Sequence, residues 1–427
     1  MVQRQILAVL LLSATVSALQ AQTASTPRAR AVASDVAWLA ADEREGRMTC
    51  ERGGEEAARW LAEQFRRIGL RPAGDSGSFF QRWTTPSTTG TRQAQAAGCA
   101  TQNVAGLVPG SGALAGQVVI VGAHYDHVGR GRFASRDSAP GQVHNGADDN
   151  ASGTAAVLEL ARTVTRARRS PRADARAVLF VLFSAEEIGA IGSAYFAEHS
   201  PVPLDSVMAY LNFDMVGRLR EGRLLVLGAR TATEWPELLE TANAGSRLDL
   251  RASGDGWGPS DHASFYARRL PVLHFFTDLH EDYHSSRDDA AAINADGIVQ
   301  VVDVAAALVN QLAVRQARLT FVDVPRPQPA VAAAGRGRPS LGTIPDMTDE
   351  PGGVRLTGVR AGSVADSAGL RAGDILIGLG VHPIANLQDF QNALTAHAPG
   401  DRVEVRFRRG DQLMRVTVVL GGTRPQD

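Results

Sequence analysis

The sequence predicts an α/β protein, with a mostly parallel sheet sandwiched by helices and a small β-rich domain after it. Amphipathic helical stretches alternate with apolar runs of strand length, which favours a parallel sheet covered on both faces. The runs do not alternate with polar residues, as is typical of strands buried on both sides. They are Val118 to Val121, Ala177 to Phe183, Val207 to Phe213 and Pro271 to Phe276.

Helices are expected before, between and after these strands. Residues 31–70 carry apolar residues at helical spacing, and Glu55 to Gly69 forms a second amphipathic helix closed by glycine. Gly153 to Arg168 has small and aliphatic residues on one side, and the segment from Ile293 to Ala313 is the last helix of this part.

Length and charge limit the number of domains and the kinds of partner. A chain of 427 residues is long enough for two domains. Its 44 basic and 45 acidic residues give a formal net charge of -1, which argues against nucleic acid as a partner.

The N-terminus is typical of an export signal. A short basic start precedes an apolar run from Ile6 to Leu19 that is too short to span a bilayer, and Ala18 and Ala21 offer cleavage sites. We therefore expect residues 1–21 to be a signal peptide, no transmembrane anchor, and a mature protein that is periplasmic or secreted. In an oxidising compartment, the two cysteines, Cys50 and Cys99, are either bridged or two separate thiols.

Polar residues follow each of the four predicted strands. His124 follows the first, Glu186 and Glu187 the second, Asp214 the third and His284 the fourth. Open α/β sheets bind their ligands at the carboxyl edge of the strands, so these side chains are expected to meet there. The Asp148-Asp149 pair precedes the helix at Gly153, and taken alone it would be a helix cap.

The residue types indicate metal chemistry. Two histidines with several carboxylates and no nearby cysteine suit zinc, and the carboxylates are too many for one four-coordinate ion. A pair of metal ions with a shared carboxylate fits the number better. His124 and Asp126 lie on one face of a continuing strand, so Asp126 can accept from the imidazole and orient it. Adjacent Glu186 and Glu187 point apart, so one can ligate while the other serves as a general base.

Six motifs in this order resemble the co-catalytic zinc peptidases, which include secreted bacterial leucyl aminopeptidases, aminopeptidase Y and glutamate carboxypeptidase II. The resemblance covers residues 31–318. Its motifs are Gly122-Ala-His-Tyr-Asp-His-Val-Gly129, Asn145-Gly-Ala-Asp-Asp-Asn-Ala-Ser-Gly153, Phe183-Ser-Ala-Glu-Glu-Ile-Gly189, Asn212-Phe-Asp-Met-Val-Gly217, Ser260-Asp-His262 and Tyr283-His-Ser285.

The resemblance implies a role for each matched residue. One zinc ion would be held by His124, Asp149 and Asp214, and a second by Asp149, Glu187 and His284. Asp149 would bridge the two ions, Asp126 would orient His124, and Asp148 would keep a capping or supporting role.

The implied activity is that of an aminopeptidase acting on peptide substrates. Glu186 would take a proton from the attacking water and return it to the leaving amine. A glutaminyl cyclase-like acyltransferase with a single zinc ion, a carboxypeptidase on the same fold and a non-catalytic peptide-binding scaffold are the alternatives.

Other polar residues near these motifs have less definite roles. Asp261 and His262 either line the substrate pocket or hold the preceding loop. His127, His274 and His280 are expected to be structural. Residues 137–143, rich in small and polar side chains, are a candidate flap over the metals.

A second domain is expected after a linker rich in Pro, Ala, Gly and Arg at residues 324–339. Residues 340–424 have short alternating strands and one helix, Leu387 to His397, capped by Asn386. This region resembles a bacterial PDZ domain, which implies that the loop Leu341, Gly342, Thr343 and Ile344 binds the carboxylate of a C-terminal peptide added as a strand. The alternative is that the domain only packs on the catalytic domain or its substrate entrance.

Overall fold

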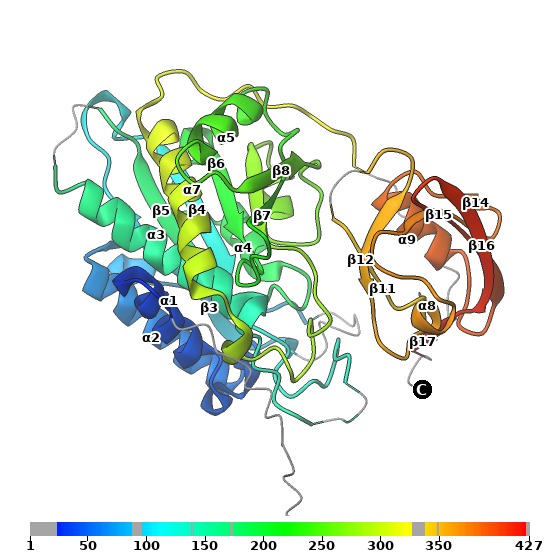
Figure 1. Cartoon of the computed structure of the whole chain (residues 1–427). Helices are drawn as coiled ribbons and strands as arrows, with labels where there is room; N and C mark the ends of the chain where they lie inside the picture. The colour runs from blue at the N-terminus through cyan, green and yellow to red at the C-terminus, as the bar shows by residue number, and fades with distance from the viewer. Residues whose placement is uncertain are drawn as a thin grey trace, which may run out of the picture.

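The computed structural model describes residues 24–87, 96–137, 139, 141–170, 174–326, 338–347 and 350–423. The signal peptide expected at residues 1–21 lies outside these residues, as does most of the linker expected at 324–339. Within the described residues the chain forms a large α/β domain and a small β-rich domain (Figure 1).

A nine-stranded sheet forms the centre of the large domain in its described part. The strand order is β1-β3-β5-β4-β6-β9-β7-β8, with β2 paired to β3. Strands β5, β4, β6 and β9 run parallel, whereas β3 and β7 join the two sides of this group antiparallel. The strands are β1 (Arg71–Pro72), β2 (Phe80–Thr84), β3 (Ala100–Val108), β4 (Val118–His124), β5 (Ala177–Phe183), β6 (Val207–Phe213), β7 (Arg223–Leu227), β8 (Asp249–Ser253) and β9 (Val272–Phe276).

The four predicted strands are confirmed as the parallel centre of this sheet. Their side chains are buried along their whole length, which explains why their sequences show no alternation. Their register aligns the carboxyl ends, because His124 lies opposite Phe183 and Phe213 opposite Phe275. The residues that follow these strands therefore emerge at one edge.

Helices cover both faces of the sheet, as predicted. One face carries α1 (Pro27–Leu39), α2 (Arg52–Ile68), α3 (Gly153–Ala167), α5 (Trp235–Asn243) and α7 (Ala295–Val314). Figure 1 shows α1, α2, α3 and α7 together on this side. The other face carries α4 (Ile191–Glu198) and α6 (His262–Tyr266), which pack on Phe183 and Tyr210.

The two helices expected within residues 31–70 are α1 and α2, and Gly69 closes α2 as expected. Helices α1 and α2 are separated by a kinked 3-10 turn, η1 (Asp42–Arg47), in which Gly46 has φ 69° and Arg47 has φ 48°. A Cβ at Gly46 would lie 2.5 Å from the carbonyl oxygens of Gly129 and His144, so the backbone approaches too closely there for a side chain. This close tertiary approach, which sequence periodicity does not report, shapes the turn between the two helices.

By length and composition alone, helix α7 could cross a membrane. It is instead a core helix of the large domain, where residues such as Ile298, Val302 and Leu308 are fully buried. At the edge of the domain, a disulfide joins Cys50, just before α2, to Cys99, just before β3.

The small domain is an antiparallel sheet with the order β11-β12-β13-β15-β16. Helix α9 begins after Asn386, whose side chain accepts from the backbone N–H of Asp389 at 2.9 Å, as expected of its cap. The elements are β10 (Arg338–Ser340), β11 (Thr343–Pro345), β12 (Val354–Val359), α8 (Val364–Ser367), β13 (Ile375–Leu379), β14 (His382–Pro383), α9 (Leu387–Thr395), β15 (Arg402–Arg409), β16 (Gln412–Val419) and β17 (Gly421–Thr423).

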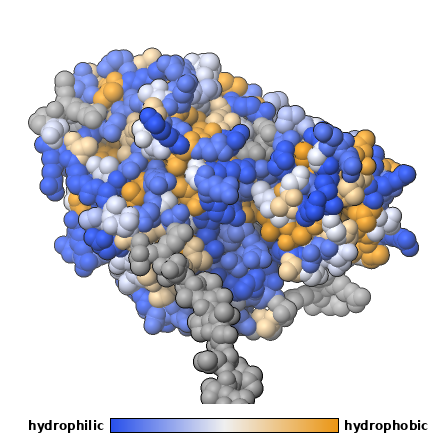
Figure 2. Space-filling model, viewed as in Figure 1, coloured by the Kyte–Doolittle hydropathy of each residue, from blue (hydrophilic) through white to orange (hydrophobic). Residues whose placement is uncertain are grey.

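The two domains touch beside β7. Asp346, directly after β11, forms a 2.5 Å ion pair with Arg223 of β7, and Met347 packs near Met215 and Phe276. Figure 2 shows a largely polar face with hydrophobic residues gathered on the small domain. On strand β16 of this domain, Leu413 is 75% exposed.

Candidate metal centre

The polar residues expected at the strand ends meet at one edge of the sheet. His124, Asp149 and Asp214 form one group, and His127, Asp149, Glu187 and His284 form a second. In each group one nitrogen or oxygen atom per residue lies within 4.8 Å of all the others. All five residues expected to be ligands are therefore in these groups, together with His127, for which only a structural role was expected.

Asp149 belongs to both groups. Its Oδ1 lies 3.4 Å from His124 Nε2, and its Oδ2 lies 3.1 Å from His284 Nε2. The two oxygens of one carboxylate thus face different imidazoles. This is the arrangement needed for a carboxylate shared between two cations.

The loop before α3 holds Asp149 in place. Its peptide bond to Asn150 is cis. The carboxylate of Asp288 accepts from the backbone N–H groups of Asp148 and Asp149 at 2.9 and 3.0 Å. Asp148 faces away from both groups and accepts from Gly217 N at 2.6 Å and from Ser152 Oγ at 2.9 Å. Its contacts are those of a residue that supports the loop.

His124 ends β4 and is oriented through its other ring nitrogen. Nδ1 lies 3.1 Å from the backbone carbonyl oxygen of Asp126 and 3.8 Å from its carboxylate. The carbonyl, rather than the expected carboxylate, therefore takes the imidazole hydrogen bond. The carboxylate of Asp126 accepts instead from the backbone N–H of Glu186 at 3.1 Å and from Thr49 Oγ1 at 3.0 Å.

Glu186 and Glu187 lie in the turn after β5 and point in different directions. Glu187 contacts His127 Nδ1 at 2.7 Å and His284 Nε2 at 3.1 Å. Glu186 lies on the other side, with Oε2 4.0 Å from His124 Nε2 and the side chain 13% exposed. Ala185 before them has φ 63°, an uncommon conformation for a residue with a side chain.

The site attracts positive charge. Burial alone would lower the pKa of His284, but Glu187 and Asp149 raise it to about 10. Burial, reinforced by the negative charges of Asp261 and Glu187, raises the pKa of Glu186 well above its usual range. Carboxylates in excess of imidazoles favour bound cations.

The unpaired atoms at the site also fit a cation. Among the described residues, Asp214 Oδ1 and His284 Nε2 are buried without a hydrogen-bond partner, although His284 Nε2 lies 3.1 Å from two carboxylates. Buried polar atoms are nearly always paired, so atoms that face one another without hydrogen bonding call for another partner. Imidazole nitrogens and carboxylate oxygens are donors that zinc accepts.

Residues 103–309 match the family model for Peptidase family M28, and residues 339–420 match the model for the PDZ domain. Residues 103–309 belong to peptidase family M28.

Curated relatives of the M28 domain include peptidases from several bacteria. Leupeptin-inactivating enzyme 1 of Streptomyces exfoliatus is 33% identical over 161 residues, which cover 38% of this chain and 32% of that protein. Aminopeptidase YwaD of Bacillus subtilis is 28% identical over 221 residues, 49% of this chain and 44% of that one. The matches span between 32% and 66% of the length of the first three curated relatives.

Solved structures share the fold of the M28 domain. A Zn-dependent exopeptidase from Parabacteroides distasonis superposes with a TM-score of 0.54 at 17% identity, covering 67% of this chain and 99% of that one. Porphyromonas gingivalis glutaminyl cyclase gives 0.52 at 17% identity, covering 66% and 98%. The expected zinc-exopeptidase-like fold is confirmed, and the fold alone does not separate these activities.

Sequence reasoning missed three residues of the large domain that build this site. Arg47 is fully buried and donates to the carbonyl oxygens of Tyr125 and Gly146, which lie within two of the motifs. Asp288 holds the Asp149 loop, and His127 joins the second group. His127 stands next to Asp126 in a recognised motif, so the sequence offered it as a candidate. Nothing in the sequence pointed to Arg47, because its contacts come from distant segments.

The remaining predicted residues are placed as follows. Asp261 and His262 are buried behind Asp214, and the His262 ring lies 4.7 Å from that of His274. His280 Nε2 lies 3.1 Å from Asp148 Oδ2. In the candidate flap, Asp137 accepts from the backbone N–H of Ser286 at 2.8 Å, and residues 138 and 140 lie outside the described residues.

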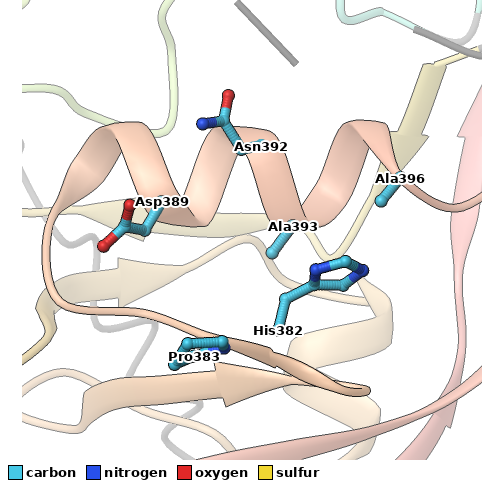
Figure 3. Close-up of a pocket in the computed structure, with 6 residues that line it drawn as sticks. All are labelled: His382, Pro383, Asp389, Asn392, Ala393 and Ala396. Atoms are coloured by element: carbon cyan, nitrogen blue, oxygen red, sulfur yellow. The ribbon is translucent and has the colours of Figure 1, made fainter. Parts of the chain in front are cut away.

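In the PDZ domain, the four loop residues expected to bind a carboxylate lie at β11. Leu341 and Gly342 are buried, and Thr343 and Ile344 belong to this edge strand, which pairs with β12. A pocket of about 300 Å³ lies elsewhere, between α9 and β14, and none of the four residues lines it (Figure 3). Its lining residues are His382, Pro383, Asp389, Asn392, Ala393 and Ala396.

Proposed function

We propose that this protein is an exported, zinc-dependent aminopeptidase that hydrolyses N-terminal residues from peptides. The observation that carries the proposal is the carboxylate of Asp149, which faces two groups of ligand atoms beside Glu186. The M28 match and the similarity to curated aminopeptidases support it.

Two zinc ions fit the residues present. His124 and Asp214 would hold one ion, Glu187 and His284 the other, and Asp149 both. When bound, the ions would polarise the scissile carbonyl and make a water molecule more acidic. The unpaired buried atoms of Asp214 and His284 support this assignment.

Glu186 is proposed as the general base and acid. Its carboxylate takes a proton from the attacking water, the water oxygen bonds to the carbonyl carbon, and the carbon–nitrogen bond breaks as Glu186 returns the proton to the leaving amine. The hydrogen bond from its backbone N–H to Asp126 fixes the turn that carries it.

The proposed export rests on the N-terminal pattern of residues 1–21 and is supported by the Cys50–Cys99 disulfide, since such bonds persist in oxidising compartments. N-terminal sequencing of the protein recovered from the periplasm and the medium tests this proposal. A mature chain starting near residue 22 is expected, and a cytoplasmic protein that keeps Met1 would contradict it.

The PDZ domain is proposed to take an extended C-terminal peptide along β11. In the described residues this strand pairs only with β12, so its other edge offers free backbone groups. Fluorescence anisotropy with labelled peptides tests this proposal. A free C-terminal carboxylate should bind more tightly than the same peptide amidated, and equal binding would rule out carboxylate recognition.

The central experiment is hydrolysis by the purified, zinc-reloaded protein. Aminoacyl chromogenic substrates should be cleaved, chelator should abolish cleavage, and Glu186→Gln should lower kcat by roughly 10²–10⁴-fold. Glu198→Gln, at a side chain that is 63% exposed, is the matched control and should keep the wild-type rate.

Blocked substrates separate the related activities. Peptides blocked at the N-terminus should resist cleavage, whereas peptides blocked at the C-terminus should not. The reverse preference would indicate a carboxypeptidase, and cyclisation of N-terminal glutamine without hydrolysis would indicate a glutaminyl cyclase. An unchanged rate in Glu186→Gln would remove the proposed mechanism.

A further inference from the structure

His127 lies where a fourth ligand of the second group would be. We propose that His127 binds one of the two cations directly, together with Asp149, Glu187 and His284, and so closes that site. The site formed by His124, Asp149 and Asp214 then keeps an open position. This inference rests on the proposed function, because it assigns ligands within the same centre.

The four donors converge, and their separations bracket those expected around one tetrahedral ion. Donors about 2.0–2.2 Å from a zinc ion are separated from one another by about 3.3–3.6 Å in tetrahedral geometry. The separations within this group lie on both sides of that range. His127 Nδ1 lies 2.7 Å from Glu187 and 3.8 Å from Asp149, and His284 Nε2 lies 3.1 Å from each carboxylate.

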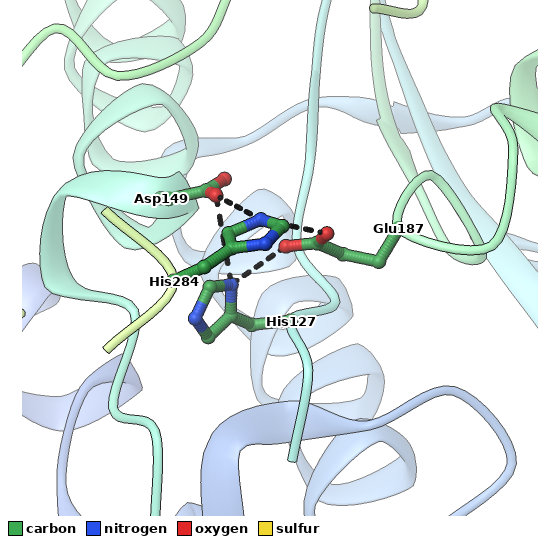
Figure 4. Close-up of side chains that lie close together, drawn as sticks. All are labelled: His127, Asp149, Glu187 and His284. Atoms are coloured by element: carbon green, nitrogen blue, oxygen red, sulfur yellow. Dashed lines mark hydrogen bonds and ion pairs between the residues drawn. The ribbon is translucent and has the colours of Figure 1, made fainter. Parts of the chain in front are cut away.

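The two imidazoles converge on the same space. Figure 4 shows the rings of His127 and His284 approaching the carboxylates of Asp149 and Glu187 from different parts of the chain. Their centroids are 5.6 Å apart with an interplanar angle of 76°. Two nitrogens can therefore face one point without their rings colliding.

His127 is held in this orientation by the backbone of the Asp149 loop. The residue is fully buried, and a Cβ added at Gly146 would lie 2.5 Å from two carbons of its ring. Gly146 itself has φ 54°. The ring fits because position 146 is glycine, so the loop that carries Asp149 also fixes His127.

Unequal ligand numbers give the two sites different chemistry. Zinc with four protein ligands is typical of closed sites, whereas three ligands leave a position for water or substrate. The three-ligand site is the one beside Glu186, whose Oε2 lies 4.0 Å from His124 Nε2. The proposal therefore places the exchangeable ligand next to the residue that transfers protons.

The competing role for His127 is hydrogen bonding. Its Nδ1 could donate to Glu187 at 2.7 Å and position that carboxylate without touching a cation. Zinc affinity alone does not distinguish a ligand from a hydrogen-bonding partner at position 127, because mutating a residue that only orients a ligand also changes metal affinity by about 10–100-fold. The number of imidazoles bound to zinc does separate them.

X-ray absorption spectroscopy on the full-length protein loaded with two zinc ions tests the proposal. Wild type should show three imidazoles shared by two ions, and His127→Gln, whose amide can still donate to Glu187, should show two. The tighter of the two zinc affinities should also fall at least about tenfold in this variant. Two imidazoles in the wild type would overturn the proposal.

His280→Gln is the matched control, because His280 is buried beside Asp148 and belongs to neither ligand group. It should keep three imidazoles, and loss of one would mean that the change in His127→Gln is not specific. The number of zinc-bound imidazoles is measured without any catalytic turnover. A protein with three zinc-bound imidazoles that cleaves no peptide would refute the proposed function and leave this inference standing.

Discussion

Arg47→Met should destabilise the large domain strongly, because Arg47 links the segments that carry the ligands. Its guanidinium is fully buried and donates to the carbonyl oxygens of Tyr125 at 2.8 Å, Leu39 at 2.8 Å, Asn145 at 2.6 Å and Gly146 at 2.9 Å. Methionine fills similar space but donates no hydrogen bond.

The expected loss is about 3–5 kcal/mol in the free energy of unfolding. Each buried acceptor left without a donor costs about 1–3 kcal/mol, so four carbonyls set an upper limit well above this value. Removing the guanidinium also removes the cost of burying its charge, which lowers the pKa of Arg47 to about 10. The net effect is therefore smaller than the sum of the four bonds.

The loss should be greater in chelated protein than in zinc-loaded protein. Arg47 is a positive charge near Asp149, Asp126, Asp288 and Glu187, and bound cations would take over part of that role. Equal losses in the two states would mean that hydrogen bonding alone explains its contribution.

Urea unfolding followed by tryptophan fluorescence measures this loss. All five tryptophans, at positions 38, 60, 83, 235 and 257, precede the PDZ domain, so the signal reports the larger domain. Arg66→Met is the control, because its side chain is 68% exposed and the change should stay within about 0.5 kcal/mol. A loss below about 1 kcal/mol for Arg47→Met would refute the reasoning.

Three further predictions concern single carboxylates. Burial raises the pKa of Asp278 from 3.8 to about 6. Its ionised form therefore destabilises the fold above pH 6, and Asp278→Asn should raise the unfolding free energy at pH 8 by up to about 3 kcal/mol. The gain should vanish below pH 4, and an equal gain at both pH values would contradict it. Asp149→Asn should lose zinc at both sites by elemental analysis, whereas Asp148→Asn should retain it. Equal, mild losses in the two variants would show that Asp149 is not the carboxylate shared by the two ions. Burial alone would raise the pKa of Asp374, but hydrogen bonds from Arg409 and from the backbone N–H of Arg371, together with the charges of both arginines, lower it. The contribution of Asp374 to PDZ stability should therefore disappear as pH falls below about 4. Urea unfolding of Asp374→Asn, followed by far-UV circular dichroism, should show less acid dependence than wild type, and an unchanged dependence would count against this pairing.

The sequence determined the centre of the fold because the signal there is local. A strand buried on both faces must be apolar at every position, so β5 and β6 were predicted with the bounds that the structure has. Strand β3 was missed because Thr101, Gln102 and Asn103 interrupt its apolar residues. Its position beside β5 follows from pairing with a distant segment.

For the candidate metal centre, too, the sequence determined some features and the tertiary structure decided others. Residues at strand ends are brought to one edge by topology, so His124, Glu187 and Asp214 could be expected to meet before any contact was known. What only the tertiary structure decided is which atoms face one another. The sequence indicated neither that the carbonyl of Asp126 orients His124 nor that His127 reaches Glu187, 60 residues away. These contacts depend on the angles at which distant backbones approach, which neither periodicity nor motif spacing specifies.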